Sequence, residues 1–434
     1  MLSGRVHAAL SRRGIHYGWI VAATTFLTML IMAGAVGAPG VFIVPLQREF
    51  GWDAAEVSTA LAVRFALFGL MGPFAAAFMN RYGLRRVMLV ALVIVGGGLL
   101  LSLRMSRLWE LVLLWGIVVG FGTGLTAVVL GATVATRWFG ARRGLVVGLL
   151  AASSATGQLV FLPLLAGVTE ALGWRAALGI VCTALLLAAV VVSLLMRDRP
   201  ADLGLPPYGE RALQPAPEAA ASLGALLLSP LRVLRDAAGN RAFWVLFGTF
   251  FICGASTNGL IQTHFIAMCG DYGVLAVSAA GVLALMGVFD FVGTVGSGWL
   301  SDRYDNRWLL FWYYGLRGLS LALLPLTDFS IYGLTIFAVF YGLDWIATVP
   351  PTVKLAVTHF GAAQANIVFG WVFAGHQLGA AAAAYGAGLS RVQFASYLPA
   401  FVIAGLLCLL AALLILTLAA PGSRSAPVPE PSAA

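Results

Sequence analysis

Twelve long apolar runs constrain the fold of this chain more than any other feature. A helix rises about 1.5 Å per residue, so about 17–25 mostly apolar residues are enough to cross the core of a bilayer. The chain has 434 residues, is 61% hydrophobic and is only 10% charged, against ~25% charged in a typical soluble protein. The runs cover residues 17–46, 56–79, 87–103, 109–135, 143–170, 174–196, 243–267, 275–300, 308–326, 331–355, 366–389 and 395–419. The sequence therefore predicts an all-α integral membrane protein with twelve transmembrane helices.

The placement of Arg indicates the orientation of these helices. Cytoplasmic connections of membrane proteins carry an excess of Lys and Arg. If the N-terminus is cytoplasmic, the cytoplasmic segments hold eighteen Arg: Arg5, Arg12, Arg13, Arg81, Arg85, Arg86, Arg137, Arg142, Arg143, Arg197, Arg199, Arg211, Arg232, Arg235, Arg241, Arg303, Arg307 and Arg424. The opposite side holds five: Arg48, Arg104, Arg107, Arg175 and Arg391. We expect both termini in the cytoplasm and interpret the net charge of +9 as a topology signal rather than a nucleic-acid site.

The longest polar interval divides the chain into two parts. It covers residues 197–241, contains six prolines, and separates six runs from six. Within it, residues from Ser222 to Leu234 are expected to form a short amphipathic helix on the membrane surface. The predicted organisation is a six-helix bundle at 1–196, a cytoplasmic linker at 197–241, a second six-helix bundle at 242–420 and a disordered cytoplasmic tail at 421–434.

The sequence carries no pattern of an enzyme. There is no HExxH, GxSxG or P-loop Lys, and the four cysteines show no metal-ligand spacing. We therefore expect free thiols, no cofactor and no metal. Because the P-loop Lys of an ATPase is also missing, any transport must be driven by an ion gradient or by exchange. Nothing in the sequence indicates oligomerisation, and we expect a monomer.

Four ionisable residues lie near the centres of apolar runs: Asp290, Arg317, Asp344 and His376. A charge at that depth costs about 2.5–3.5 kcal/mol on insertion scales, so such residues normally face a polar cavity or each other. Two acids share one central Arg, and Arg317 pairs with either Asp344 or Asp290. The acid left unpaired is expected to hold a proton, either as a proton carrier or as a permanent hydrogen-bond donor.

The run around Asp344 also predicts a polar helical face. Tyr341, Asp344, Trp345 and Thr348 are spaced i, i+3, i+4 and i+7, which places them on one side of a helix. Pro350 and Pro351 follow and are expected to bend that helix. The face is expected to line a pathway, and the alternative is that Asp344 only neutralises Arg317.

Other polar residues are expected near the centre: Gln377, Asn258, Gln262, Arg64 and Gln158. Arg64 is expected either to extend outward to the polar surface or to bind a carboxylate. His376 is expected to be either a proton carrier or a hydrogen bonder in helix packing.

Two loops repeat one motif at equivalent places in the two parts. Residues 76–86 read AAFMNRYGLRR and residues 298–307 read GWLSDRYDNR. Both resemble the signature loop of the major facilitator superfamily, G-x-x-x-D-R-x-G-R-R. The resemblance implies two six-helix bundles with a substrate site between them near the bilayer midplane. The loops are expected either to anchor the topology or to form a gating latch, whose residues are Asn80, Arg81, Arg85, Arg86, Asp302, Arg303 and Arg307.

Residues 15–185 also resemble the monocarboxylate transporter family of that superfamily. The matching segments are Gly18-Trp19, Gly40 to Phe42, Leu46 to Gly51, Asn80 to Gly83, Arg142 to Gly148 and Gly173 to Arg175. Asp290 matches an Asp of the animal members, but Gly37 and Thr294 stand where those members carry Lys and Arg.

The resemblance implies a secondary transporter of a small organic anion in the inner membrane of a bacterium, but without that Lys and Arg it does not imply specificity for lactate or pyruvate. The unpaired central acid predicts that transport is coupled to protons. One alternative is a proton-driven exporter of drugs or metabolites, and another is a membrane receptor that transports nothing. The short loops and the lack of a signalling domain weigh against the receptor.

Overall fold

The computed structural model describes residues 7–8, 11–126, 128–213 and 223–419. These residues form helices joined mostly by short turns, with one isolated parallel bridge between Phe139 and Tyr208. Nine helices of the described part are long and apolar enough to cross a membrane. The predicted all-helical class is confirmed. The runs 109–135, 143–170 and 308–326 fall on helices outside those nine spans, so the count of twelve stays a prediction.

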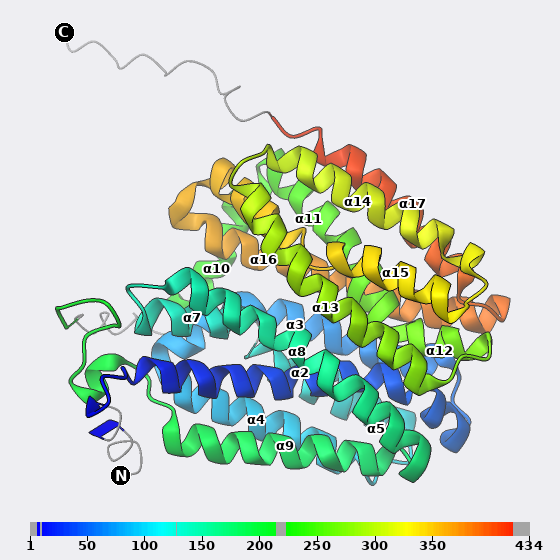
Figure 1. The fold of residues 1–434 in the computed structure, drawn as a ribbon, viewed down its shortest axis with the longest axis horizontal. Coiled ribbons are helices and arrows are strands. Elements are labelled where there is room, and N and C mark those ends of the chain that lie inside the picture. The colour runs from blue at the N-terminus through cyan, green and yellow to red at the C-terminus, as the bar shows by residue number, and fades with distance from the viewer. Residues whose placement is uncertain (1–6, 9–10, 127, 214–222, 420–434) are drawn as a thin grey trace.

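The first part of the chain forms helices that lie together in the lower half of Figure 1. Their bounds are α2 Gly18–Phe50, α3 Ala54–Tyr82, α4 Leu84–Ser102, α5 Leu108–Leu111, the π-helical η1 Val112–Val119, α6 Gly120–Gly124, α7 Val128–Trp138, α8 Arg143–Leu172 and α9 Trp174–Leu195. Asp53 starts α3 by accepting the Glu56 N–H, while Glu56 accepts the Asp53 N–H in return. Gly83, at φ 87°, forms the turn from α3 to α4 that a side chain would strain.

The second part forms the helices of the upper half of Figure 1. Their bounds are α11 Arg241–Gly254, the π-helical η3 Ala255–Gln262, α12 Thr263–Asp271, α13 Ala276–Ser301, α14 Asn306–Leu323, the 3-10 turn η4 Leu324–Thr327, α15 Ile331–Asp344, α16 Val349–Phe394 and α17 Leu398–Ile415. Gly361, at φ 75°, kinks α16 into two helices. A second interruption lies earlier, since α15 ends at Asp344 and α16 begins at Val349. The predicted run 331–355 therefore falls on two helices, α15 and the start of α16.

The two groups of helices meet along a seam between α3 and the second stretch of α16. Ring contacts join Phe68 to Phe373 at 6.0 Å and Phe74 to Trp371 at 6.1 Å between centroids. Closer to the other end of α3, Gly388 packs directly against Ser58. Small residues allow helices to approach closely without a hydrophobic driving force. The seam is thus closed along most of the length of α3.

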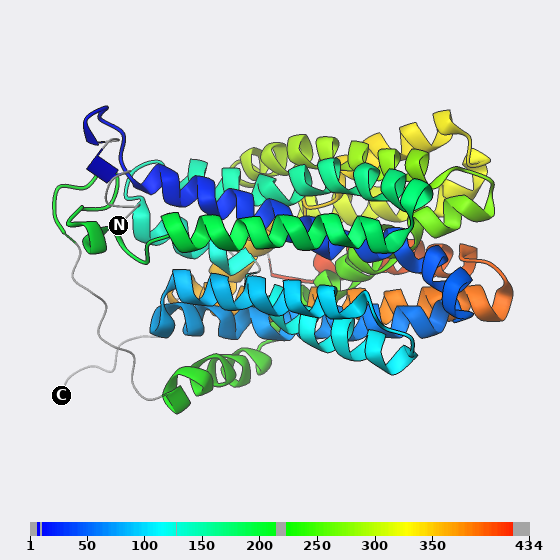
Figure 2. The same ribbon diagram turned by 90° about the horizontal axis from the view of Figure 1, so that it is seen from below.

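The segment between the two groups packs against both of them. Tyr208 exchanges backbone hydrogen bonds with Trp138 and Gly140 of the first group, at 2.8 and 3.0 Å. Helix α10, Leu223–Ala238, follows and confirms the predicted helix. It lies on the outside of the bundle at the end that carries the N-terminus (Figure 2), where the Trp371 indole donates to the Pro230 carbonyl at 2.9 Å. Ser222 and the tail 421–434 lie outside the described residues.

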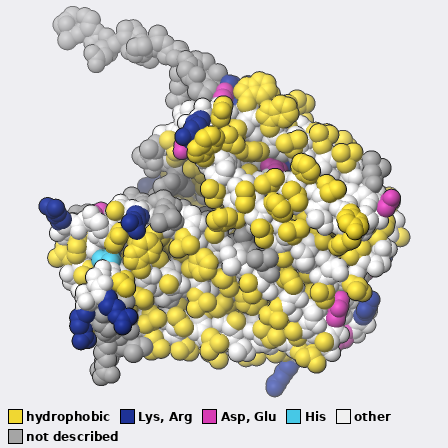
Figure 3. All heavy atoms as spheres, in the orientation of Figure 1, with side chains coloured by type: hydrophobic (Ala, Val, Ile, Leu, Met, Phe, Trp, Pro, Cys, Tyr) yellow, Lys and Arg dark blue, Asp and Glu magenta, His cyan; other side chains and the backbone are white. Residues whose placement is uncertain are grey.

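The surface matches the expected charge pattern. In Figure 3, hydrophobic side chains cover the middle of the molecule, and Lys and Arg side chains gather mainly at the left end, where Figure 1 places the N-terminus. Large apolar side chains are exposed on both halves, such as Leu187 on α9 and Phe291 on α13. A wide apolar zone of this kind is typical of a surface that contacts lipid.

Candidate functional site

A break in the helix around Asp344 organises the polar centre of the second half. Helix α15 ends at Asp344, residues 345–348 form turns, and α16 begins at Val349. Pro350 and Pro351 occupy the first turn of α16, where a missing N–H costs no helical hydrogen bond. The expectation of one continuous helical face was therefore wrong, because the break precedes the prolines and puts Trp345 and Thr348 in the turns.

Arg317 of α14 binds the broken end of α15. Its Nε donates to Asp344 Oδ2 at 2.6 Å, and its Nη2 donates to the carbonyls of Asp344 and Trp345 at 2.5 and 3.1 Å. Its Nη1 also contacts the Cys253 sulfur at 2.9 Å. Arg317 is 1% exposed. The structure thus assigns Asp344 as the partner of Arg317, and the planar guanidinium caps the freed carbonyls at the same time.

Asp290 of α13 binds the other side of the break. Its Oδ1 accepts the Ile346 N–H at 2.9 Å and the Thr294 hydroxyl at 3.0 Å. Of the two acids expected to compete for Arg317, Asp290 is therefore the one without a cation partner among the described residues, and the break supplies it with a backbone donor instead. Ser297, one turn after Thr294, donates to the Ala347 carbonyl at 2.5 Å. Sequence reasoning missed Ser297, although its spacing of seven residues from Asp290 places both on one helical face.

Two further expected residues lie beside this break. The Tyr341 hydroxyl donates to the Ser256 carbonyl at 2.8 Å, and the Trp345 ring packs edge-on against Tyr341 at 5.7 Å. Asp344 Oδ1 is buried and has no hydrogen-bond partner among the described residues. A buried acceptor without a partner is costly. This oxygen is therefore the one atom of the Arg317–Asp344 pair that remains available to a proton or a donor.

His376 and Gln377 lie on α16, where it packs against α11. The His376 ring lies 5.0 Å from Phe250 and 5.6 Å from Phe373, and Gln377 Nε2 lies 3.3 Å from His376 Nδ1. The Gln377 oxygen is buried without a partner among the described residues. These contacts fit the packing interpretation of His376 and leave the Gln377 amide oxygen available.

The remaining expected residues divide between two helical segments. Gln262 is buried and Asn258 is half-buried on η3, and π-helical segments of this kind are frequent at functional sites. Gln158 lies on α8, and its side chain is outside the described part of the structure. Among the described side chains, the hydrogen bond that connects η3 to this region is the one from the Tyr341 hydroxyl of α15 to the Ser256 carbonyl. No hydrogen bond joins Asn258 or Gln262 to residues 345–348 within the described part.

Arg64 is a buried cation of the first half. It lies on α3, is 3% exposed, and donates from Nη1 to the Val36 carbonyl of α2 at 2.8 Å. Its Cα packs against Gly120 of α6. No carboxylate among the described residues forms an ion pair with it. The contact with Val36 directs Arg64 inward, so the outward extension that the sequence left open is not observed.

The signature loops make contacts within their own halves. Asp302 pairs with Lys354, Asp305 pairs with Arg307 at 2.6 Å, and Arg307 also donates to the Leu418 carbonyl at 2.8 Å. The hydrogen bond from the Lys354 ammonium lowers the pKa of Asp302 below its ordinary value. The Arg303 guanidinium stacks on the Trp299 ring at 4.0 Å.

In the first half, the corresponding loop is bound to the last turn of α9 and to the residues that follow it. The Arg85 N–H donates to Asp198 at 2.8 Å, and the Arg85 guanidinium donates to the Ser193 carbonyl at 2.5 Å. Arg81 lies over the Tyr82 ring, Arg86 is exposed, and the Asn80 side chain is outside the described part. In this conformation the described loop contacts hold each half together, and the latch between halves stays a prediction.

Comparison with known proteins places the chain in a family. A family model described as Major Facilitator Superfamily matches residues 25–384. The chain is 27% identical over 418 residues to monocarboxylate transporter 13 of Bos taurus, covering 96% of this chain and 92% of that protein. It is 22% identical over 392 residues to the uncharacterized MFS-type transporter YcxA of Bacillus subtilis (strain 168), covering 86% of this chain and 88% of that protein.

Solved structures show the same fold. A crystal structure of the peptide transporter POT in complex with sulfate matches with a TM-score of 0.71 at 14% identity, covering 91% of this chain and 93% of that chain. At this identity the likeness concerns the fold alone. Together with the match over residues 25–384, it confirms the resemblance seen in the repeated loops. The chain is a transporter, not an enzyme, and it belongs to the Major Facilitator Superfamily.

Proposed function

We propose that this protein carries a small organic anion across a bacterial inner membrane, coupled to protons, by alternating access between two six-helix bundles. The proposal includes twelve spans with both termini in the cytoplasm. The observation that carries it is Arg64, a buried guanidinium whose observed partner is a carbonyl and not a carboxylate. A buried charge is stable only when paired and hydrogen-bonded. A substrate carboxylate supplies that pair, in keeping with the name of the bovine relative.

Asp290 supports the proton coupling. It is buried in the second half, and its hydrogen bonds come from Ile346 and Thr294 rather than from Arg317. Since neither donor carries a charge, a proton on Asp290 neutralises the carboxyl group inside the membrane. An anion on Arg64 and a proton on Asp290 cross together in symport, and each half then contributes one of the two ligand sites.

The first test is binding and transport by purified protein. In a thermal-shift screen against lactate, pyruvate, benzoate and longer acids, a ligand at 100 times its dissociation constant stabilises the protein by about 2.7 kcal/mol. Uptake of the stabilising acid into proteoliposomes should follow an imposed pH gradient. Arg64→Gln should abolish both binding and uptake, because it removes the charge but keeps a donor for Val36.

Arg64→Lys provides the matched control, because it keeps the positive charge. It should retain measurable uptake with weaker binding, since a Lys ammonium cannot hold a carboxylate in a two-pronged contact. Full uptake in Arg64→Gln would show that Arg64 does not hold the anion. Export of cationic compounds in exchange for protons, without any effect of organic acids, would favour the exporter instead.

A further inference from the structure

The π-helical segment η3, Ala255–Gln262, interrupts the α-helical path between α11 and α12 in the second half. All of its residues except Asn258 are buried. A π-helix pairs residues i and i+5 where an α-helix pairs i and i+4, so a change between the two shifts the chain by about one residue, or about 1.5 Å along the axis. The segment therefore has two registers available to it.

The start of η3 is bound to the break between α15 and α16. The Tyr341 hydroxyl, in the last turn of α15, donates to the Ser256 carbonyl at 2.8 Å. Cys253, in the last turn of α11, lies 3.4 Å from the Thr348 hydroxyl and accepts from Arg317 Nη1 at 2.9 Å. A movement of the break is therefore passed directly to the start of η3.

Asp290 holds the other side of the same break. Its Oδ1 accepts the Ile346 N–H at 2.9 Å. A hydrogen bond to an ionised carboxylate is about twice as strong as one between neutral groups. Protonation of Asp290 therefore weakens the hold of α13 on residues 345–348, and Tyr341 carries the change to the Ser256 carbonyl.

The end of η3 touches α2 of the first half. A Cβ added at Gly40 would lie 2.5 Å from the Gln262 carbonyl and 3.3 Å from the Thr263 carbonyl. Gly40 shares one turn of α2 with Val36, whose carbonyl accepts from Arg64 Nη1 at 2.8 Å. So close a contact leaves no room for Gln262 to move without displacing this turn of α2, and with it the group that Arg64 binds.

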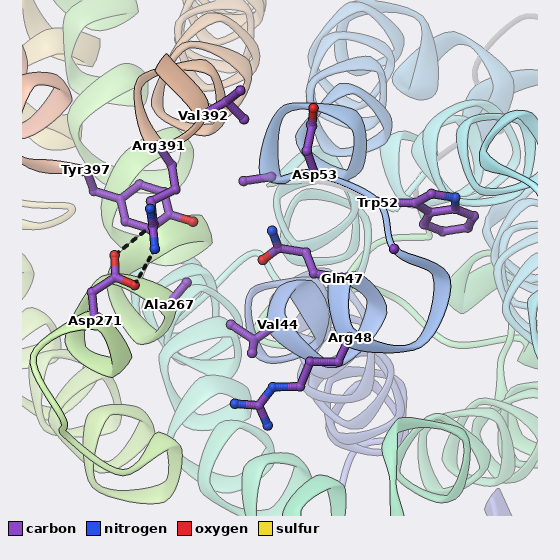
Figure 4. Close-up of a pocket in the computed structure, with 12 residues that line it drawn as sticks. Val44, Gln47, Arg48, Trp52, Asp53, Ala267, Asp271, Arg391, Val392 and Tyr397 are labelled. Atoms are coloured by element: carbon purple, nitrogen blue, oxygen red, sulfur yellow. Dashed lines mark hydrogen bonds and ion pairs between the residues drawn. The ribbon is translucent and has the colours of Figure 1, made fainter. Parts of the chain in front are cut away.

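Open volume lies beside this contact. Val44 of α2 and Ala267 of α12, each about one turn further toward the end opposite the N-terminus, line a pocket of about 570 Å³ between the two halves (Figure 4). The pocket leaves α2 and α12 room to move relative to each other there. Coupling between distant sites requires an element with two arrangements that both sites bias, and η3 meets that condition through its contacts at both ends.

We propose that η3 couples proton binding at Asp290 to anion binding at Arg64 by changing register, and that Tyr341 is the positioning residue that connects it to the break. When Asp290 is ionised, the break holds η3 in the observed π-helical register, and Gln262 presses on α2 beside the Val36 carbonyl. When Asp290 is protonated, η3 relaxes, that turn of α2 moves, and Arg64 is released to hold the anion. The inference rests on the proposed function, because it connects the two ligand sites that the function assigns.

The pH dependence of anion binding tests the coupling. Benzoate, which is ionised at both pH 6 and pH 8, is the probe, and its dissociation constant is measured by calorimetry on the purified full-length protein. The wild-type protein should bind benzoate about tenfold more tightly at pH 6, within the usual range of coupling between two sites. Tyr341→Phe should bind it equally at both pH values, because the ring remains but the hydroxyl that holds Ser256 is absent.

Tyr314→Phe is the matched control. The Tyr314 and Tyr341 rings lie 5.8 and 5.9 Å from the guanidinium carbon of Arg317, and both side chains are fully buried. The Tyr314 hydroxyl makes no hydrogen bond to η3 among the described residues, so Tyr314→Phe should keep the tenfold difference. A difference that persists in Tyr341→Phe, or that both variants lose equally, would overturn the role of Tyr341.

Hydrogen exchange of the η3 amides tests the inference without any ligand. In lipid nanodiscs, Asp290→Asn stands for the protonated acid and should speed exchange in residues 255–262 about fivefold, the lower end of typical coupling. In the Tyr341→Phe background, Asp290→Asn should make no difference, because the connection to Ser256 is already absent.

The two measurements separate this inference from the proposed function. If no organic acid binds but exchange in η3 responds to Asp290→Asn through Tyr341, the proposed function fails and the coupling element stands. If uptake follows the pH gradient and exchange in η3 is unchanged by Asp290→Asn, the coupling through η3 fails alone.

Discussion

Arg317 shows how one buried side chain serves two purposes. Its guanidinium neutralises Asp344 and also satisfies carbonyls of Asp344 and Trp345 that the end of α15 leaves without helical partners. A Lys ammonium has no planar fork and cannot reach these acceptors in the same geometry. The residue is therefore expected to be as important for the local backbone as for the charge balance.

Arg317→Ala should lose stability, because removal of one partner of a buried pair typically costs about 3–5 kcal/mol. Adding Asp344→Asn should recover part of the loss, since the unpaired carboxylate is then absent. Unfolding of the single and double variants in detergent, followed by thermal shift, measures both effects. A single variant as stable as the wild type would mean that the pair contributes nothing.

Asp290→Asn should abolish uphill uptake driven by a pH gradient, because Asn carries no titratable proton. Its amide oxygen still accepts from Ile346 N–H, so counterflow exchange should be retained. Asp290→Leu is the control and should lose both activities, since it leaves that N–H unsatisfied. Proteoliposomes with and without an imposed gradient provide the measurement. Unchanged uphill uptake in Asp290→Asn would assign the proton to Asp344 or His376 instead.

At the scale of elements, the break between α15 and α16 is held by side chains of two neighbouring helices. Asp290 and Ser297 of α13 bind Ile346 and Ala347, while Arg317 of α14 binds the last carbonyls of α15. Irregular backbone at membrane depth is tolerated only where protein groups or water satisfy it. The break between α15 and α16 therefore depends on hydrogen bonds from α13 and α14.

Ser297→Ala should destabilise the protein by about 1–3 kcal/mol, the usual cost of an unsatisfied buried group. The Ala347 carbonyl loses its observed donor in that variant. Ser153→Ala is the matched control, because Ser153 is equally buried but donates within its own helix, to the Leu150 carbonyl. Thermal unfolding of the two variants should differ, and equal losses would show that Ser297 does not support the break.

At the scale of the whole molecule, the seam between α3 and α16 connects the two halves through close packing, whereas the described contacts of the signature loops lie within each half. Alternating access is expected to open the seam at one end at a time while each half moves largely as a body.

The contribution of the Asp302–Lys354 pair to transport should not change with pH in the neutral range. A lowered folded pKa means that the Asp302–Lys354 pair is fully formed above the ordinary carboxyl range and is lost only as the pH falls through the lowered value. Asp302→Asn should therefore change the uptake rate by the same factor at pH 6 and at pH 8. A factor that differs between these two pH values would mean that Asp302 titrates during transport.

The topology is open to a direct test. Eighteen Arg on one side against five on the other predict that both termini and residues 197–241 are cytoplasmic. Cysteines introduced at Ser106 and Ser222 should be labelled from opposite sides of the membrane. Labelling of Ser222→Cys by an impermeant reagent on intact cells would invert the proposed orientation.

The sequence by itself determined the class of the protein, and the tertiary structure decided the partners of its central charges. Run length, the repeated loops and the segments shared with transporters are local in sequence, so they predicted the helical fold and the superfamily. Pro350 and Pro351 predicted a bend in this region, but the contacts of Asp290 and Arg317 were not predictable, because they depend on the exact place of the break at 345–348 and on helices distant in sequence. That break exists because α13 and α14 satisfy its backbone, and only the packed helices bring those groups together.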